Sequence, residues 1–103
     1  ALIFIRACGL GPLPGVLAEF AWVLKSRFAL PGDAVAHALR AMLDNATLAW
    51  QSRPAAVEAL RLFEQGSVDF PDCLIVALAG SAGCEAVATF DQGMRTLPKV
   101  RLL

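Results

Sequence analysis

Three carboxylates stand in apolar surroundings, where a charged side chain is unusual. Glu19 is the only charged residue in the stretch 16–24. Asp72 directly precedes the apolar stretch 73–78, and Asp91 follows a short, mostly apolar segment. An ionised carboxylate that is buried without a partner costs several kcal/mol, so such groups are normally paired, neutralised by a shift in pKa, or bound to a cation. These acids are therefore the first candidates for chemistry.

The position of Asp91 indicates which chemistry to expect. It follows the segment 84–90, which is predicted as a strand, and ligands of open parallel sheets collect beyond the carboxyl ends of the strands. Thr89, two residues earlier, can present a hydroxyl to the same crevice. Carboxylates that gather there without histidine partners favour a hard divalent ion, Mg²⁺ or Mn²⁺. The expected reaction is metal-assisted hydrolysis of a phosphodiester.

Each candidate also has a purely structural explanation. Glu19 fits the solvent-facing side of an amphipathic helix, and Thr89 fits an ordinary strand. Asp69 fits the N-cap of the helix that follows it, and with Asp72 near the third position the pair would form an arrangement like a capping box. Both acids would also complement the positive end of the helix dipole. Capping accounts for Asp69 better than for Asp72, because Glu or Gln is the usual third-position partner.

The cysteines and the histidine indicate no further chemistry. Cys8, Cys73 and Cys84 are odd in number and form no CxxC pair, which is typical of reduced thiols in a cytoplasmic protein. His37 is the only histidine and has no Cys or His at ligand spacing.

The composition predicts one globular domain over residues 1–103. The chain carries nine basic and nine acidic residues, 57% apolar residues and 17% charged residues, against about 25% charged in a typical globular chain. This composition excludes disorder, and zero net charge removes the general electrostatic argument for binding nucleic acid or membranes. The longest uncharged stretches have twelve residues, where a membrane-spanning helix needs about 20. The apolar excess predicts a homodimer with Trp22, Phe28 and Met42 as anchors.

The positions of apolar residues and helix breakers predict the elements that must hold the acids. Helices are predicted at 16–28, 33–45, 52–66 and 69–80, and strands at 47–50, 84–90 and 100–103, while 2–5 is ambiguous. Asp33 is predicted as an N-cap. The last helix is apolar nearly all round, which predicts a central, buried position. The alternation of helices and short strands predicts a parallel α/β sheet.

Three segments carry a resemblance to a known family. They are VLAEFAWVL at 16–24, DFPDCLI at 69–75 and ATFD at 88–91. Their order and spacing resemble those of PIN-domain ribonucleases, in particular VapC-like toxins of bacterial toxin–antitoxin pairs. The resemblance covers the chain from about Leu13 to its C-terminus and implies a three-layer α/β/α fold, with a small parallel sheet that has helices on both faces.

The resemblance also implies roles for the acids. Glu19, Asp72 and Asp91 correspond to catalytic metal ligands for Mg²⁺ or Mn²⁺. Asp69 corresponds to an auxiliary acid found in part of the family, and Thr89 to a supporting hydroxyl. The implied partners are an RNA substrate, a cognate antitoxin and a second copy of the chain. The short uncharged stretches and the unpaired cysteines separately predict a cytoplasmic protein without a membrane partner.

The chain departs from the family pattern at its start. The family begins with a strand that ends in an Asp-Thr-Asn-type motif whose Asp is a principal metal ligand, and the sequence contains no such motif. Aligning 2–6 to that strand would put Arg6 in the place of the acid. We interpret residues 1–103 as a PIN-like domain without its N-terminal strand, and so expect a metal-dependent endoribonuclease toxin. The alternative is a non-catalytic interaction domain whose acids are helix caps and solvated surface.

Overall fold

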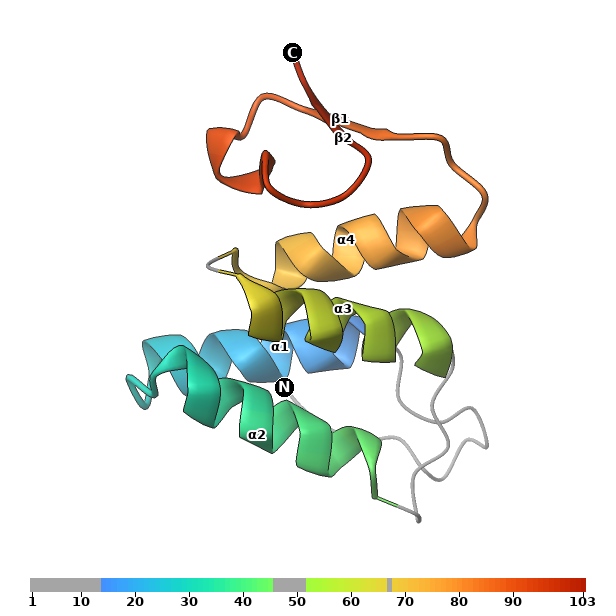
Figure 1. Ribbon diagram of the computed structural model, residues 1–103. Coiled ribbons are helices and arrows are strands. Elements are labelled where there is room, and N and C mark those ends of the chain that lie inside the picture. Colours follow the sequence, from blue (N-terminus) through green and yellow to red (C-terminus); the bar gives the residue numbers. More distant parts are fainter. Residues whose placement is uncertain (1–13, 46–51, 67) are drawn as a thin grey trace. The chain divides into compact units, whose positions relative to one another are not determined.

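The computed structural model describes residues 14–45, 52–66 and 68–103 (Figure 1). The described elements are α1 (Pro14–Ser26), α2 (Gly32–Leu43), α3 (Arg53–Gln65), α4 (Phe70–Ser81), β1 (Val87–Thr89), the 3₁₀ turn η2 (Gln92–Met94) and β2 (Val100–Leu102). The predicted strand at 47–50, the ambiguous segment 2–5 and Cys8 lie outside the described residues. The chain divides into two compact units, 1–54 and 55–103.

In the first unit, α1 and α2 pack against one another. The buried side chains of α2 recur with helical spacing at Val35, Leu39 and Leu43. The prediction that Asp33 is the N-cap is wrong: Pro31 holds that position, with extended backbone at φ −69° and ψ 163°. A proline suits the turn into a helix because its φ is fixed and it has no N–H to satisfy. Asp33 lies in the first turn, where its Oδ1 accepts the Ala34 N–H at 3.0 Å.

In the second unit, α4 lies between α3 and the sheet (Figure 1). The buried residues of α3 include three alanines, Ala55, Ala56 and Ala59. At the start of α4, Phe70 is 2% exposed and meets Phe63 of α3 edge to face, with ring centroids 5.8 Å apart. Such an aromatic pair stabilises a contact beyond the area it buries.

The strands β1 and β2 are parallel, with Val87 opposite Val100 and Thr89 opposite Leu102. Two further bonds extend this ladder, from Val87 N–H to the Lys99 carbonyl and from Leu103 N–H to the Thr89 carbonyl, each 2.9 Å long. The predicted α/β class with a small parallel sheet is thus confirmed.

The helix α4 is less covered than its composition predicts. Cys73 is fully buried and Leu74 and Val76 are nearly so, but Ile75 is 51% exposed and Leu78 36% exposed. The predicted central position is present, since α4 lies between α3 and the sheet and has five buried residues, but the helix is not covered on every side. An apolar composition does not tell how many sides of a helix have a neighbour. No helix in the described part of the chain is long and apolar enough to cross a bilayer.

Candidate metal-binding site

The first acids of the site stand at the start of α4. Asp69 is the N-cap residue, with φ −64° and ψ 148°, and its carbonyl oxygen accepts the N–H groups of Asp72 and Cys73 at 3.2 Å each. The Asp69 side chain makes no capping hydrogen bond. The capping-box alternative is therefore wrong: the backbone of Asp69 starts the helix, and its carboxylate has no part in the cap.

Asp91 stands two residues after the end of β1 and is held by hydrogen bonds to its neighbours on both sides. Its N–H donates to Thr89 Oγ1 at 3.0 Å, and its Oδ1 accepts the Gly93 N–H at 2.8 Å. Its carbonyl accepts the Met94 N–H at 3.1 Å, which closes the turn η2. The Thr89 hydroxyl thus fixes the backbone that carries the acid, which is how it supports Asp91 in this structure.

Gly93 is a positioning residue that the sequence reasoning missed. A Cβ atom placed on Gly93 would lie 3.1 Å from Asp91 Oδ1, closer than side chains normally approach. A side chain at this position would displace the carboxylate by a few tenths of an ångström, whereas glycine donates its N–H without displacing it. The signal in the sequence is the Asp-x-Gly spacing of residues 91–93, since Asp side chains often bond the backbone two residues on.

The pKa of Asp72 indicates that the aspartates of the second unit lie near one another. Asp72 is half-buried, and its pKa is raised above the ordinary value, first by burial and then by the negative charges of Asp91 and Asp69. The start of α4 and the end of β1 therefore bring like charges close enough to repel each other. A cation relieves such repulsion, and a set of carboxylate oxygens suits a hard divalent ion. The residues present fit Mg²⁺ or Mn²⁺ by their donor chemistry.

Glu19 lies on α1 in the first unit, and its side chain is exposed. Asp69, Asp72, Thr89 and Asp91 all belong to the second unit. The convergence of Glu19 with these aspartates stays a prediction. Within the described ranges, no group of three or more carboxylate, thiol or imidazole side chains already stands at the spacing that would hold a metal ion.

The thiol next to Asp72 has a structural role. Cys73 is fully buried, and its Sγ donates to the Val68 carbonyl at 3.9 Å. Burial, followed by the charges of Asp72 and Asp69, raises the pKa of this thiol to about 11. At neutral pH it is a protonated, small hydrophobic group that anchors the first turn of α4.

The sequence matches the PIN domain over residues 14–100, a range that contains every element described above apart from the last two residues of β2. Proteins with this domain are typically nucleases. No curated protein and no solved structure matches the chain. Since the match covers more than half of the 103 residues, the chain belongs to the PIN domain family.

Proposed function

We propose that this PIN domain is a metal-dependent endoribonuclease and the toxin of a bacterial toxin–antitoxin pair. The observation that carries the proposal is the half-buried Asp72, whose pKa is raised first by burial and then by the negative charges of Asp91 and Asp69. Negative groups gathered against their own repulsion need a functional reason, and cation binding supplies one.

Each residue has a part in this proposal. Asp72 and Asp91 hold Mg²⁺ or Mn²⁺, Asp69 adds an auxiliary oxygen, and Glu19 joins them from α1. When bound, the ion lowers the pKa of a coordinated water and stabilises charge on the scissile phosphate. The Gly93 N–H occupies one oxygen of Asp91, Oδ1, and so orients the carboxylate.

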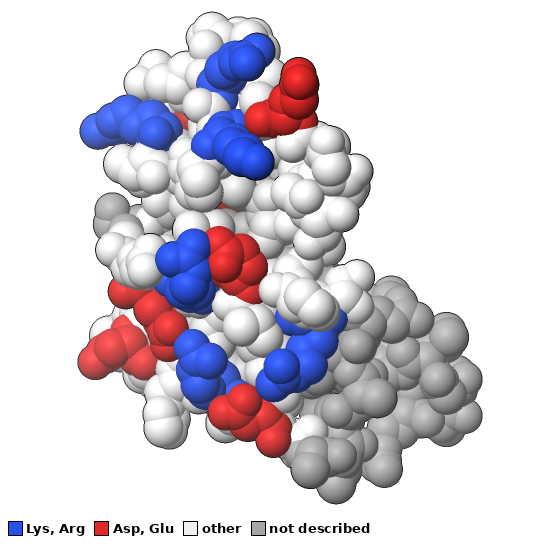
Figure 2. Space-filling view, turned by 45° about the vertical axis from the view of Figure 1, so that its right-hand side comes forward, with Lys and Arg blue, Asp and Glu red and all other residues white. Residues whose placement is uncertain are grey.

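RNA recognition in this proposal depends on the local site. Basic and acidic side chains are interspersed over the face drawn in Figure 2, and the chain has no net charge. Long-range attraction of a polyanion is therefore weak, and contacts close to the aspartates must select the RNA.

The proposed protein partners are a second copy of the chain and an antitoxin. Trp22 is 60% exposed and Phe28 66% exposed in the first unit, and these aromatic side chains are of the kind enriched in interfaces. With Met42 they form the proposed dimer contact. An antitoxin would lay an apolar segment into a neighbouring groove and place a basic side chain among the acids. Sedimentation at micromolar concentration tests the dimer, because a species of 10.9 kDa alone contradicts it.

The nuclease proposal is tested by metal binding and cleavage together. We expect Mn²⁺ to raise the melting temperature of the chain, because a ligand that binds only the folded state stabilises it by mass action. We also expect cleavage of a fluorescent RNA that stops when EDTA is added. Asp33→Asn, a matched change in the first turn of α2, serves as the control for Asp72→Asn. An unchanged melting temperature with intact RNA would favour the non-catalytic interaction domain instead.

A further inference from the structure

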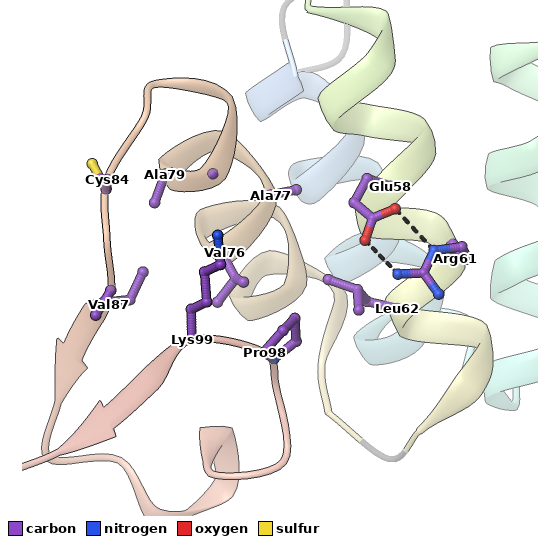
Figure 3. A pocket seen from close by; sticks show the side chains of 12 residues that line it. Glu58, Arg61, Leu62, Val76, Ala77, Ala79, Cys84, Val87, Pro98 and Lys99 are labelled. Carbon is purple, nitrogen blue, oxygen red and sulfur yellow. Dashed lines mark hydrogen bonds and ion pairs between the residues drawn. The ribbon is translucent and has the colours of Figure 1, made fainter.

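A pocket of about 270 Å³ opens in the second unit between α3, α4 and the start of the sheet (Figure 3). Its walls come from Leu62 of α3, from the second half of α4 beginning at Val76, and from Val87 and Pro98 beside the strands. Nothing described above uses this pocket.

The pocket lies at the end of α4 away from the aspartates. Asp72 is in the first turn of the helix, while the pocket is lined by its later residues as far as Gly80. Along the helix, Val76 and Gly80 lie about 6 Å and 12 Å of rise from Asp72, and none of the three aspartates lines the pocket. On β1 the same order holds, because Val87, the first residue of the strand, lines the pocket and Asp91 lies two residues beyond the last. The pocket is therefore separate from the candidate metal-binding site.

The floor of the pocket is apolar. Leu62, Val76 and Ala77 are each at most 7% exposed where they line it. Val87 and Pro98 add further apolar surface at the sheet side. A hydrocarbon or aromatic body gains by displacing water from such a surface.

The charged residues at the pocket leave one positive charge uncompensated. Arg61 and Glu58 bind each other, with Nε 2.8 Å from Oε1 and a second contact between Nη2 and Oε2. Their hydrogen bond and mutual attraction lower the pKa of Glu58, so this pair is neutral as a whole. Lys99 forms no ion pair with any of the described residues, and its side chain reaches across the pocket toward Val76 (Figure 3).

The backbone at Lys99 is strained. Its φ is +58°, a left-handed conformation that side chains other than Gly, Asn and Asp rarely adopt. The strand ladder holds it there, since the Lys99 carbonyl accepts the Val87 N–H at 2.9 Å. Strain of this kind is concentrated at ligand sites, where it fixes a side chain in a needed place.

We propose that this pocket binds a small apolar monocarboxylate, with the carboxylate on the Lys99 ammonium and the apolar body on Leu62, Val76 and Val87. One uncompensated cation in a pocket whose other charged pair is neutral complements a single negative charge. A phosphate dianion is less well matched, because Lys99 alone offsets only one of its two negative charges while Arg61 is already paired with Glu58. The volume is just below the range of about 300–1,000 Å³ for drug-sized ligands, which suits a fragment-sized molecule.

The modification rate of the Cys84 thiol reports on occupancy of the pocket, because Cys84 lines the pocket and is exposed whereas Cys73 is buried. In a Cys8→Ala background of the full chain, the rate at which a thiol reagent modifies Cys84 is followed with hexanoate as the probe. We expect the rate to fall by about tenfold at a probe concentration about nine times its Kd, because only the unliganded fraction reacts. Hexanamide lacks the negative charge and acetate lacks the apolar chain, so each should protect Cys84 from the thiol reagent much less than hexanoate does.

Matched variants distinguish the effect of the Lys99 ammonium on binding from any effect of the substitution on folding. Lys99→Asn removes the charge and suits the left-handed backbone, so we expect a folded protein on which hexanoate protects no better than hexanamide. Arg101→Asn makes the same charge change in β2, outside the pocket lining, and should leave protection unchanged. Ala79→Leu narrows the pocket from a position on α4 and should abolish protection by hexanoate.

Two outcomes would overturn the proposal. Equal protection by hexanoate and hexanamide on the unsubstituted protein would show that the ammonium selects nothing. Protection by adenosine monophosphate at least as strong as by hexanoate would indicate a nucleotide site instead. The labelling is done in EDTA without RNA, so its result is independent of the proposed nuclease function.

Discussion

The two ends of α4 differ in how their charges are compensated. At its start, Asp72 is half-buried, and its pKa is raised first by burial and then by the negative charges of Asp91, which follows β1, and Asp69. At its other end, Glu58 and Arg61 of α3 neutralise each other at the pocket that Lys99 lines from the sheet side. The helix dipole favours acids at a helix start and bases near its end, so the fold tolerates both arrangements.

The comparison shows at which end of α4 like charges repel one another. An ion pair on a surface is stable without any ligand, whereas like charges held together are stable only while something else in the fold offsets them. The acidic end is therefore expected to change more when a cation arrives. The other end of α4, which lines the pocket, is expected to respond to a ligand mainly through burial of the apolar pocket walls.

The largest expected contrast is in the thiols at the two ends. In the Cys8→Ala protein at pH 8, we expect iodoacetamide to modify Cys84 and leave Cys73 unmodified. A pKa of about 11 for Cys73 leaves about one thiolate in 1,000 at that pH, and its burial slows the reaction further. Peptide mapping by mass spectrometry measures both rates. Comparable rates would mean that the start of α4 opens readily.

Removing the acid at the centre of the repulsion should have the next largest effect. We expect Asp72→Asn to lower the rate of RNA cleavage by at least about 100-fold, because even the partners of metal ligands contribute about 10–100-fold. Asp33→Asn should cleave at the original rate. If Asp72→Asn also cleaved at that rate, Asp72 would have a structural role only.

Gly93→Ala tests whether the orientation of the Asp91 carboxylate matters for RNA cleavage. The added methyl group would press on Asp91 Oδ1 from 3.1 Å, and we expect about a tenfold loss of cleavage with little change in melting temperature. Gly80→Ala is the matched control, because a Cβ there meets nothing within 4 Å. Equal activity of the two variants would show that the orientation of Asp91 is unimportant.

The sequence predicted the helices and the parallel strands because their signals are local. The spacing of apolar residues and the breaks at Gly66 and Gly83 are enough to place α3 and α4 within a few residues. The apolar pattern of β1 was also readable, although the strand covers Val87–Thr89 where 84–90 was predicted, and Phe90 separates it from Asp91.

Features that depend on local geometry or on neighbours were not predictable in this way. Asp33 and Asp69 both have the residue type of an N-cap, but Pro31 takes the first position and the second uses its backbone alone. The role of Gly93 depends on a contact of 3.1 Å that composition does not contain. The exposure of Ile75 depends on which sides of α4 have neighbours.

The smallest expected effect, on stability, has a sign that depends on metal and pH. Because the pKa of Asp72 is raised in the folded state, the folded protein binds this proton more tightly than the unfolded chain does. The group therefore stabilises the fold at low pH, and that contribution is lost as the pH rises through the raised pKa. Near pH 7 without metal, the ionised carboxylate is a cost that Asn does not carry.

In EDTA at pH 7 we expect Asp72→Asn to raise the free energy of unfolding by a few tenths of a kcal/mol, the size of a like-charge contact at a partly exposed position. Below about pH 3 the advantage should disappear, since Asp72 is then protonated in both states. With saturating Mn²⁺ the order should reverse, because the original protein gains binding energy that the variant loses. Urea unfolding under the three conditions measures all of these differences. A variant that is less stable than the original protein in EDTA at pH 7 would mean that Asp72 stabilises the start of α4, and the repulsion inferred at this end would then be wrong.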